Sequence, residues 1–313
     1  MSGGMGVGVS YRDNIARFRV NICSVRNYLF SGDGYEQAVG SENSLWVSFG
    51  DDLSLQQDIV QYGGDGESAI FAAKMRNDGY IFTAGKKALR GLRGVTEDLH
   101  NASLFMIDPQ TGESVLGGAE FGQDESNEVV WGLDFDKDGT VLAVGYTERD
   151  AVEGKAGYIG KITLTSTKPP AADFDHQYLD SPGEQAFNDV SVLNDGNYAV
   201  VGVTKQPNCD YTDGFVIILN KELPAPLVTD QYIMLSTGTN VFFNDVVVRE
   251  DGLMQIAAEV DFTGGTTLNP DIDLNGYHRV SLLLNEKYEV LQANLNDGTP
   301  VKFEKGSSDK ECP

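Results

Sequence analysis

The sequence predicts an all-β fold, a five-bladed β-propeller of four-stranded antiparallel blades. Three observations predict it. An Asp-Gly turn between two apolar runs recurs along the chain, two further short strands follow each such hairpin, and no amphipathic helix of ten or more residues is found. Four short antiparallel strands per unit, at a period of 50–60 residues, are what a propeller blade requires.

The recurring hairpin is clearest in "FNDVSVLNDGNYAVVGVTK" (187–205) and "FFNDVVVREDGLMQIAAEVD" (242–261). Asn, Asp and Gly tolerate the positive φ angles that tight hairpin turns demand. Two upstream copies turn at Asp138-Gly139 and Asp78-Gly79, and a degenerate first copy lacks the turn. The second apolar run of each copy closes after successive intervals of 53, 60, 57 and 56 residues, at Gly32, Gly85, Gly145, Gly202 and Ala258.

These copies predict one domain over residues 1–313, with blades at about 17–66, 67–125, 126–184, 185–239 and 240–303 and a C-terminal tail at 304–313. A propeller joins its last blade to its first, so we expect residues 11–20 to pair with strands near 290–303. The small residue that closes each second strand is expected to let adjacent sheets approach closely.

The pattern F-N-D-V-x-V-x-x-D-G-x-x-x-V-x-G-x-T, taken here from Phe187 to Thr204, resembles bacterial β-propeller repeats of the SBBP type. The likeness runs from about residue 17 to about residue 300 and implies a propeller architecture; it implies little about function. The terminal copies depart from the pattern: Arg26-Asn27-Tyr28 replaces the first turn, and Ala258-Glu259-Val260 replaces the last Gly-x-Thr.

The composition is strongly acidic, with 23 Lys+Arg against 47 Asp+Glu and a net charge of −24. Such a surface repels phosphate backbones, which argues against nucleic acid and anionic membranes as partners. No apolar run approaches the length of a membrane span, and the first residues lack the basic region and apolar core of a secretory signal. We nevertheless expect an extracellular or cell-surface location, because regular, turn-rich blades without a catalytic constellation suit a binding scaffold there.

The candidate functional residues lie on the first strands of the last two blades. Asp189 and Asp245 occupy equivalent positions, preceded by Asn188 and Asn244, and Trp131 is the counterpart of Asn188 in the blade before. First strands line the channel of a propeller, so the two carboxylates could act as the acid and base of glycoside hydrolysis. The alternative, which we favour because the motif belongs to the repeat itself, is that Asn-Asp supports the blade structure and serves binding.

Two segments imitate the start of a calcium loop. In "DFDKDGT" (Asp134, Asp136, Asp138) a plain hairpin turn is the preferred interpretation, and in "DIDLNGY" (Asp271, Asp273, Asn275) calcium is a real alternative. Neither has the Glu expected at the twelfth position. No other cofactor is predicted.

The remaining features leave alternatives open. The three cysteines, Cys23, Cys209 and Cys312, lack zinc spacing and suit either one disulfide with a free thiol or three free thiols. The three histidines fall in different blades. A basic patch in an acidic chain, "GKKALRGLRG" (Lys86, Lys87, Arg90, Arg93), suits a solvated loop, an acidic partner or a second copy of the protein.

The function predicted from these observations is non-catalytic: binding, adhesion or assembly by a propeller-type scaffold, with a protein or glycan ligand and self-assembly as possible partners. The alternative is a glycan-active hydrolase using Asp189 and Asp245. Connections between second and third strands (85–100, 205–214, 261–276) are expected to lie on one side of the blades and to form a composite binding surface.

Overall fold

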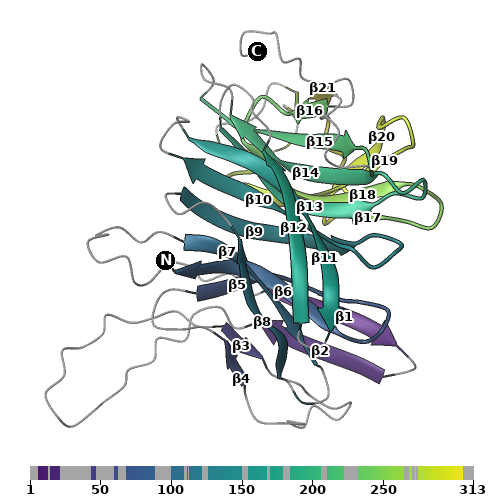
Figure 1. Ribbon diagram of the computed structural model, residues 1–313. Coiled ribbons are helices and arrows are strands. Elements are labelled where there is room, and N and C mark those ends of the chain that lie inside the picture. Colours follow the sequence, from purple (N-terminus) through teal and green to yellow (C-terminus); the bar gives the residue numbers. More distant parts are fainter. Residues whose placement is uncertain are drawn as a thin grey trace, which may run out of the picture. The chain divides into compact units, whose positions relative to one another are not determined.

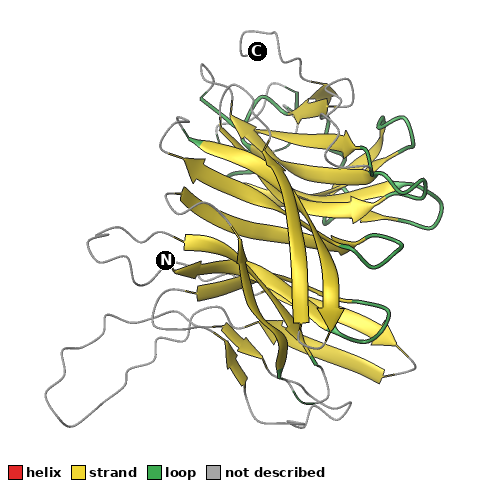
Figure 2. Cartoon of the chain, in the orientation of Figure 1, coloured by secondary structure: helices red, strands yellow, loops and turns green. Residues whose placement is uncertain are grey.

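The computed structural model (Figure 1) describes most of the chain from residue 68 onward and four short strands before it. The described residues are 6–12, 15–21, 44–46, 60–62, 68–88, 100–108, 111, 113–121, 126–149, 154–167, 170–178, 184–205, 210–221, 232–263, 268–269, 272 and 274–305. They form strands and connecting turns only, with no helix among them (Figure 2). Accordingly, the described residues include no helix that could cross a membrane.

The fold is all-β and of β-propeller type, built from consecutive antiparallel sheets. Four sheets have the complete blade meander, each with its strands in chain order. They comprise β5 (Ser68–Met75), β6 (Ile81–Ala88), β7 (His100–Ile107) and β8 (Ser114–Phe121); β9 (Ser126–Phe135), β10 (Val141–Arg149), β11 (Lys155–Thr167) and β12 (Pro170–Tyr178); β13 (Glu184–Val192), β14 (Tyr198–Lys205), β15 (Asp213–Leu219) and β16 (Tyr232–Ser236); and β17 (Val241–Val248), β18 (Met254–Asp261), β19 (Tyr277–Leu284) and β20 (Val290–Leu295).

The predicted count of five four-stranded blades is too high for the described residues, which contain four. The predicted first blade, 17–66, contributes instead to two two-stranded sheets: β1 (Gly6–Arg12) with β2 (Ile15–Asn21), and β3 (Ser44–Trp46) with β4 (Val60–Tyr62). The physical reason lies in the degenerate first copy, where no Asp-Gly turn joins a first strand to a second.

The strands at the two chain ends pair with their neighbours in sequence, β2 with β1 and β20 with β19. The expected pairing of 11–20 with 290–303 stays a prediction. The predicted tail begins as a strand, because β21 (Glu304–Lys305) pairs with β16 and becomes the fifth strand of the β13–β16 sheet.

The predicted Asp-Gly hairpins are confirmed in all four blades. Their glycines, Gly79, Gly139, Gly196 and Gly252, have φ angles of 95°, 86°, 90° and 81°, a left-handed conformation that favours glycine. In each turn the glycine amide donates to the carbonyl three residues earlier. The aspartate before each glycine accepts from the amide two residues later, as in Asp195 Oδ1 with Asn197 N at 2.9 Å. Local hydrogen bonding therefore explains why Asp and Gly stand at the turn.

Three of the first strands, β5, β13 and β17, also carry a β-bulge that the sequence analysis did not predict. The pairing shifts between Phe187 and Asp189, between Phe243 and Asp245, and between Ile70 and Ala72. The bulge inserts one residue, which increases the local twist and redirects the side chains beside it. It places Asn188 and Asn244 at the same point of two successive blades.

The bulge also shows that the small residue at the end of the second strand has a different role from the predicted one. Gly202 pairs with Phe187 at the bulge, and a Cβ on it would lie 2.1 Å from the carbonyl oxygen of Ala186 in the same sheet. The prediction that this glycine lets neighbouring sheets approach is therefore wrong for Gly202. The glycine accommodates the bulged strand of its own blade.

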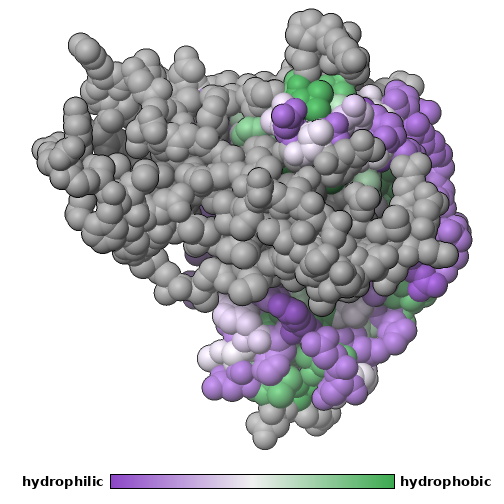
Figure 3. All heavy atoms as spheres, turned by 90° about the horizontal axis from the view of Figure 1, so that it is seen from below, coloured by the Kyte–Doolittle hydropathy of each residue, from purple (hydrophilic) through white to green (hydrophobic). Residues whose placement is uncertain are grey.

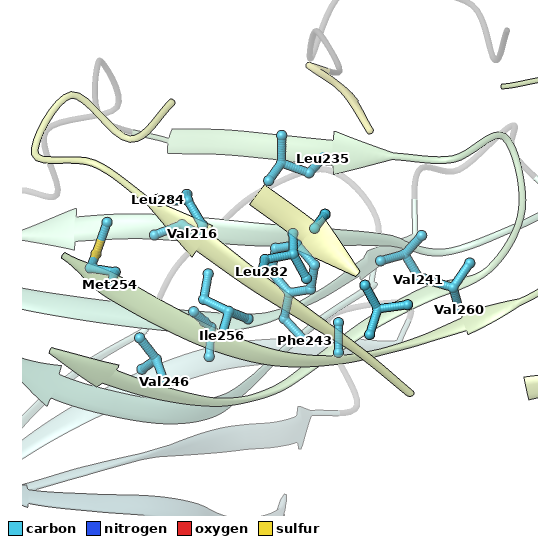
Figure 4. Packing of buried hydrophobic residues seen from close by; sticks show 14 of the residues in the cluster. Val216, Leu235, Val241, Phe243, Val246, Met254, Ile256, Val260, Leu282 and Leu284 are labelled. Carbon is cyan, nitrogen blue, oxygen red and sulfur yellow. The ribbon is translucent and has the colours of Figure 1, made fainter. Parts of the chain in front are cut away.

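The chain divides into two compact units, residues 1–130 with 164–172 and residues 131–163 with 173–313. The larger unit has a continuous apolar core between its last two blades. Val216 and Leu235 from the β13–β16 sheet pack against Phe243, Ile256 and Leu282 of the β17–β20 sheet (Figure 4). This core fixes the position of one blade on the next, and the candidate site lies along its edge.

Candidate functional site

The phenylalanine of the F-N-D-V motif packs into a glycine socket on the preceding blade. A Cβ on Gly157 of β11 would lie 2.5 Å from the ring of Phe187, and a Cβ on Gly214 of β15 would lie 2.6 Å from the ring of Phe243. Both rings are fully buried. Because the two glycines are equivalent in their blades, ring and socket form a repeated contact between successive sheets.

The asparagine and aspartate of the motif form hydrogen bonds to the next blade. Asn188 Nδ2 donates to the carbonyl of Phe243 at 2.7 Å, and Asp189 Oδ2 accepts from the amide of Val246 at 3.0 Å. Two residues on, Ser191 Oγ accepts from the amide of Val248 at 3.3 Å. Side chains of β13 thus bind the main chain of β17 at successive points.

The same connection is made one blade earlier by a different residue. Asp134, the counterpart of Ser191, accepts through Oδ2 from the amide of Val192 at 3.0 Å. Gly132, the counterpart of Asp189, leaves no room for a side chain, because a Cβ there would lie 2.6 Å from the Cα of Asp189. Position in the blade, more than residue type, therefore determines the contact.

The structure brings Asp189 and Asp245 together, as the sequence analysis considered possible. Their carboxyl groups lie within hydrogen-bonding reach of each other, with Asp189 half-buried and Asp245 exposed. Burial raises the pKa of the Asp189 carboxyl well above its ordinary value, and the hydrogen bond and charge of Asp245 raise it further. The amides of Val246 and Val190 act in the opposite direction and lower it.

The other predicted site residues have separate surroundings. Asn244 is exposed on β17. Trp131 is 37% exposed, and its ring centroid lies 6.4 Å from that of Tyr146 within the same blade. The predicted set therefore divides into an Asn188–Asp189–Asp245 group between two blades and a Trp131 that packs on its own blade.

This division yields a matched pair of variants. We expect Asn188→Ala to lower the free energy of unfolding by about 1–2 kcal/mol, because it removes a part-buried bond to the next blade. Asn244→Ala, at the same place in the last blade but exposed, is expected to change it by less than about 0.5 kcal/mol. Urea denaturation measures both. Equal losses would mean that the motif acts within its own strand instead of between blades.

The acidic loop at Asp134, Asp136 and Asp138 is a hairpin turn, as preferred. Asp134 binds the next blade, Asp136 Oδ2 accepts from the hydroxyl of Tyr198 at 2.7 Å, and Asp138 Oδ1 accepts from the amide of Thr140. The three carboxylates therefore serve three different contacts. Within the described part of the chain, no group of three or more His, Cys, Asp or Glu side chains is arranged to hold a metal.

Several predicted positions, among them Asp271 and Asp273, fall outside the described residues. Asn275 of the same segment is described: it is exposed, and its carbonyl oxygen lies 3.1 Å from Nε2 of His278. The three cysteines, Cys23, Cys209 and Cys312, and most of the basic patch lie outside as well. Their predicted roles stay predictions.

Sequence reasoning missed a second contact between blades. Asn127 Oδ1 accepts from the amide of His100 at 3.0 Å in the first unit, and Asn240 Oδ1 accepts from the amide of Thr212 at 3.0 Å in the second. Both asparagines stand eleven residues before the turn aspartate of their blade. That constant offset was the available signal, but a lone Asn at a strand start has no distinctive pattern.

We expect Asn240→Ala to lower the free energy of unfolding by about 1–2 kcal/mol, because the part-buried amide of Thr212 loses its side-chain acceptor. Asn240→Asp keeps the acceptor oxygen and should lose less. Thermal unfolding of both variants checks this expectation, and an alanine variant as stable as the parent would contradict it.

No protein-family model matches the chain, and no curated protein sequence matches it either. Among solved structures, the chain is similar to a protein of unknown function from Dyadobacter fermentans DSM 18053, at a TM-score of 0.46 and 12% identity over 97% of this chain and 83% of that one. It is also similar to CoXyl43, a GH43 beta-xylosidase/alpha-arabinofuranosidase from a compost microbial metagenome. That match has a TM-score of 0.43 and 9% identity over 91% of this chain and 92% of the other. Likeness at this level carries no argument about what this chain does.

Proposed function

We propose that this protein is a non-catalytic binding scaffold of propeller type. The observation that supports this proposal is the use made of its candidate catalytic pair. Asp189 accepts a main-chain amide of the next blade, and its carboxyl lies against that of Asp245. A carboxylate that holds two blades together is not free to turn towards a substrate.

The separation of the pair supports the same conclusion. Carboxyl groups of glycosidases stand about 5–5.5 Å apart in retaining enzymes and about 6.5–9.5 Å apart in inverting ones. The carboxyls of Asp189 and Asp245 interact directly with each other, which differs from the separated arrangement that either mechanism uses. The hydrolase alternative would need the two carboxyls to separate.

The exposed face of the β17–β20 sheet is the surface that we propose for binding. Along β18 and β19 exposed or half-buried side chains alternate with buried ones, and Val247 of β17, Tyr277 of β19 and Leu291 of β20 are each 55% exposed. Large apolar side chains that are this exposed, among polar neighbours, are typical of an interaction surface. Figure 3 views the molecule from below and shows that apolar side chains of described residues also reach the surface on that side, next to hydrophilic ones.

The equivalent face of the preceding blade, the β13–β16 sheet, packs against the β17–β20 sheet and has different residues. On that face Ala199, Val201, Val216 and Ile218 are buried in the core that the two sheets share. Their counterparts in the last blade are Gln255, Ala257, Ser281 and Leu283, and the socket position of Gly214 is taken by Arg279. An arginine there leaves no socket for a phenylalanine ring, so the face is suited to a partner other than a blade docked in the repeated manner.

The partner that we propose is a neutral glycan or a protein without a strongly acidic surface, since the net charge of −24 repels anions. An extracellular or cell-surface setting and kinship with SBBP-type repeats belong to the same proposal. The connections 85–100, 205–214 and 261–276 lie in part outside the described residues, and their role in binding stays a prediction.

The test measures hydrolysis and binding in the same samples. The protein is incubated with a panel of neutral polysaccharides, and reducing ends and bound polysaccharide are both quantified. We expect no release of reducing ends by the parent or by Asp189→Asn. Release by the parent that disappears in Asp189→Asn would overturn the non-catalytic proposal.

The variants Tyr277→Ser and Leu291→Ser test whether the ligand binds to the β17–β20 face. Both side chains are exposed, so these variants should keep the fold and weaken binding of the polysaccharide or protein partner at least tenfold. Thr163→Ser, an exposed substitution on another blade, is the control. Binding that survives both face variants would move the site elsewhere on the chain.

A further inference from the structure

A row of polar side chains crosses the β13–β16 sheet near one end. Gln185 pairs with Thr204, and Thr204 pairs with Asp213. Ser236 of the fourth strand forms a side-chain hydrogen bond with Asp213. Residues paired directly across antiparallel strands point to the same face, with Cβ atoms about 4.5–5.5 Å apart. The four side chains therefore lie in one line on one face.

The row is buried and its hydrogen bonding is incomplete. Gln185 is 3% exposed, Thr204 1%, Asp213 8% and Ser236 6%. Oε1 of Gln185, Oγ1 of Thr204 and Oδ1 of Asp213 have no hydrogen-bond partner. Three adjacent buried oxygens without a donor are costly, since each has lost its water.

The charge of Asp213 has no compensating partner among the described ion pairs. Lys155, on the preceding blade, is half-exposed and contacts Glu148 and the ring of Tyr146 instead. Burial raises the pKa of the Asp213 carboxyl, and its hydrogen bond with Ser236 lowers it. Burial and the charge of Asp213 raise the pKa of the Tyr211 hydroxyl, and a hydrogen bond with Ser236 lowers it, so this buried hydroxyl lies beside the row.

The blade architecture does not require this row. In the next blade the counterparts of Gln185 and Thr204 are Val241 and Val260, and both are fully buried. In the preceding blade Ala156 takes the place of Asp213 and pairs with Thr147. Buried polar residues, Glu128 and Thr147, stand there at the positions of Gln185 and Thr204. Polar residues therefore recur at two of the three positions, but neither neighbouring blade has a buried carboxylate at the position of Asp213.

We propose that Gln185, Thr204 and Asp213 bind a sodium ion, with Ser236 and Tyr211 as neighbouring oxygen donors. Carboxylate, amide and hydroxyl oxygens are ligands for hard cations. A single carboxylate balances one positive charge, whereas a divalent ion would leave an uncompensated charge in a buried site. The ion would supply the positive charge that the unpartnered oxygens lack and would join three strands of one blade.

The experiment is thermal unfolding of the full chain at constant ionic strength, with sodium chloride replaced stepwise by choline chloride. A ligand that binds only the folded state raises stability with the logarithm of its concentration once the site is saturated. We expect the melting temperature to rise with sodium in the parent protein. Choline, which is too large for the site, should give no such rise.

Four variants locate the effect. Thr204→Val removes one oxygen and keeps the shape, so it should weaken the apparent sodium affinity at least tenfold, whereas Thr204→Ser keeps the oxygen and the response. Thr147→Val is the matched control: it removes an equivalent buried, unpartnered hydroxyl beside Ala156 and should leave the sodium response unchanged. Asp213→Asn should abolish the response.

Equal melting temperatures in sodium and choline would overturn the proposal and leave Asp213 protonated or solvated by a buried water. A response that is specific to calcium at millimolar concentration would overturn the choice of ion. A sodium response retained by Thr204→Val and Asp213→Asn would place the ion elsewhere. Because none of these measurements involves a polysaccharide or protein ligand, the result is independent of the proposed binding function.

Discussion

Replacing Gly214 by alanine is expected to lower the free energy of unfolding by about 2–3 kcal/mol, the upper part of the range for overpacked cores. The added Cβ would lie 2.6 Å from two ring carbons of Phe243. The ring is fully buried in the core between two blades, and its centroid lies 6.4 Å from that of Phe303. It has no open space to move into, so the strands themselves must shift.

A double-mutant cycle separates this contact from a general intolerance of Gly214. Phe243→Val alone removes buried ring atoms and should cost about 2–3 kcal/mol. The double variant should lose at least about 1 kcal/mol less than the sum of the two, because a valine leaves room for the alanine. The first unit has smaller residues in this contact. Ala102 stands at the position of the glycine and Val130 at that of the phenylalanine, and both are fully buried.

Chemical denaturation of the parent, the two single variants and the double variant measures the coupling. The same cycle with Gly157→Ala and Phe187→Val tests the preceding contact and should give a coupling of the same sign. Strict additivity in both cycles would show that the ring and the glycine do not depend on each other, and that the motif's phenylalanine has been assigned the wrong partner.

The hairpins of this protein could be predicted from sequence because their determinants are local. Asp195 and Gly196 stabilise their turn through a left-handed glycine and a bond only two residues long. The same short pattern recurs in each later copy, so the blade period followed directly. The first copy lacks this local information, and there the predicted four-stranded blade is not found among the described residues.

The contacts between blades were predictable only in part. Asp189 and Asp245 were paired correctly because they share a repeat position, but their bonds to Val246 and to each other depend on how one sheet is placed on the next. The bulge at Asn188 has a visible sign, since two polar residues in succession interrupt the alternation of the strand. The glycine socket has none: Gly214 follows Asp213 and reads as part of a turn, yet it lies inside a fully buried strand.

Replacing Asp245 by asparagine is expected to raise the melting temperature at pH 7 by several degrees. In the folded protein the pKa of Asp189 is raised by burial and by Asp245, so the folded state binds more protons than the unfolded state between the two pKa values. The stabilising contribution of Asp189 is therefore complete below its unfolded pKa and is lost as the pH rises through the folded one. Asp189 therefore stabilises the native protein less at pH 7 than in acid.

An asparagine at position 245 removes the repelling charge and offers an amide donor to the Asp189 carboxylate. The pKa of Asp189 should then fall, and with it the loss of stability at neutral pH. Well below the ordinary aspartate pKa of 3.8 the Asp189 carboxyl is protonated in the folded and in the unfolded state, so the difference between variant and parent should become small there. Asp189→Asn should behave alike, since its amide can donate to Asp245 while its oxygen still accepts from Val246.

Melting temperatures of parent and variants from pH 3 to pH 8 test this expectation. Asp297→Asn is the control of opposite sign. The amide of Thr299 donates to the Asp297 carboxylate and lowers the pKa of Asp297. The Asp297 carboxylate therefore stabilises the fold above pH 3.8, and this stabilisation is lost as the pH falls. That variant should therefore gain nothing at pH 7. If Asp245→Asn instead lowers the melting temperature at pH 7, the two carboxylates are held together by a bound cation. The contact between the last two blades would then depend on that ion and not on the two side chains alone.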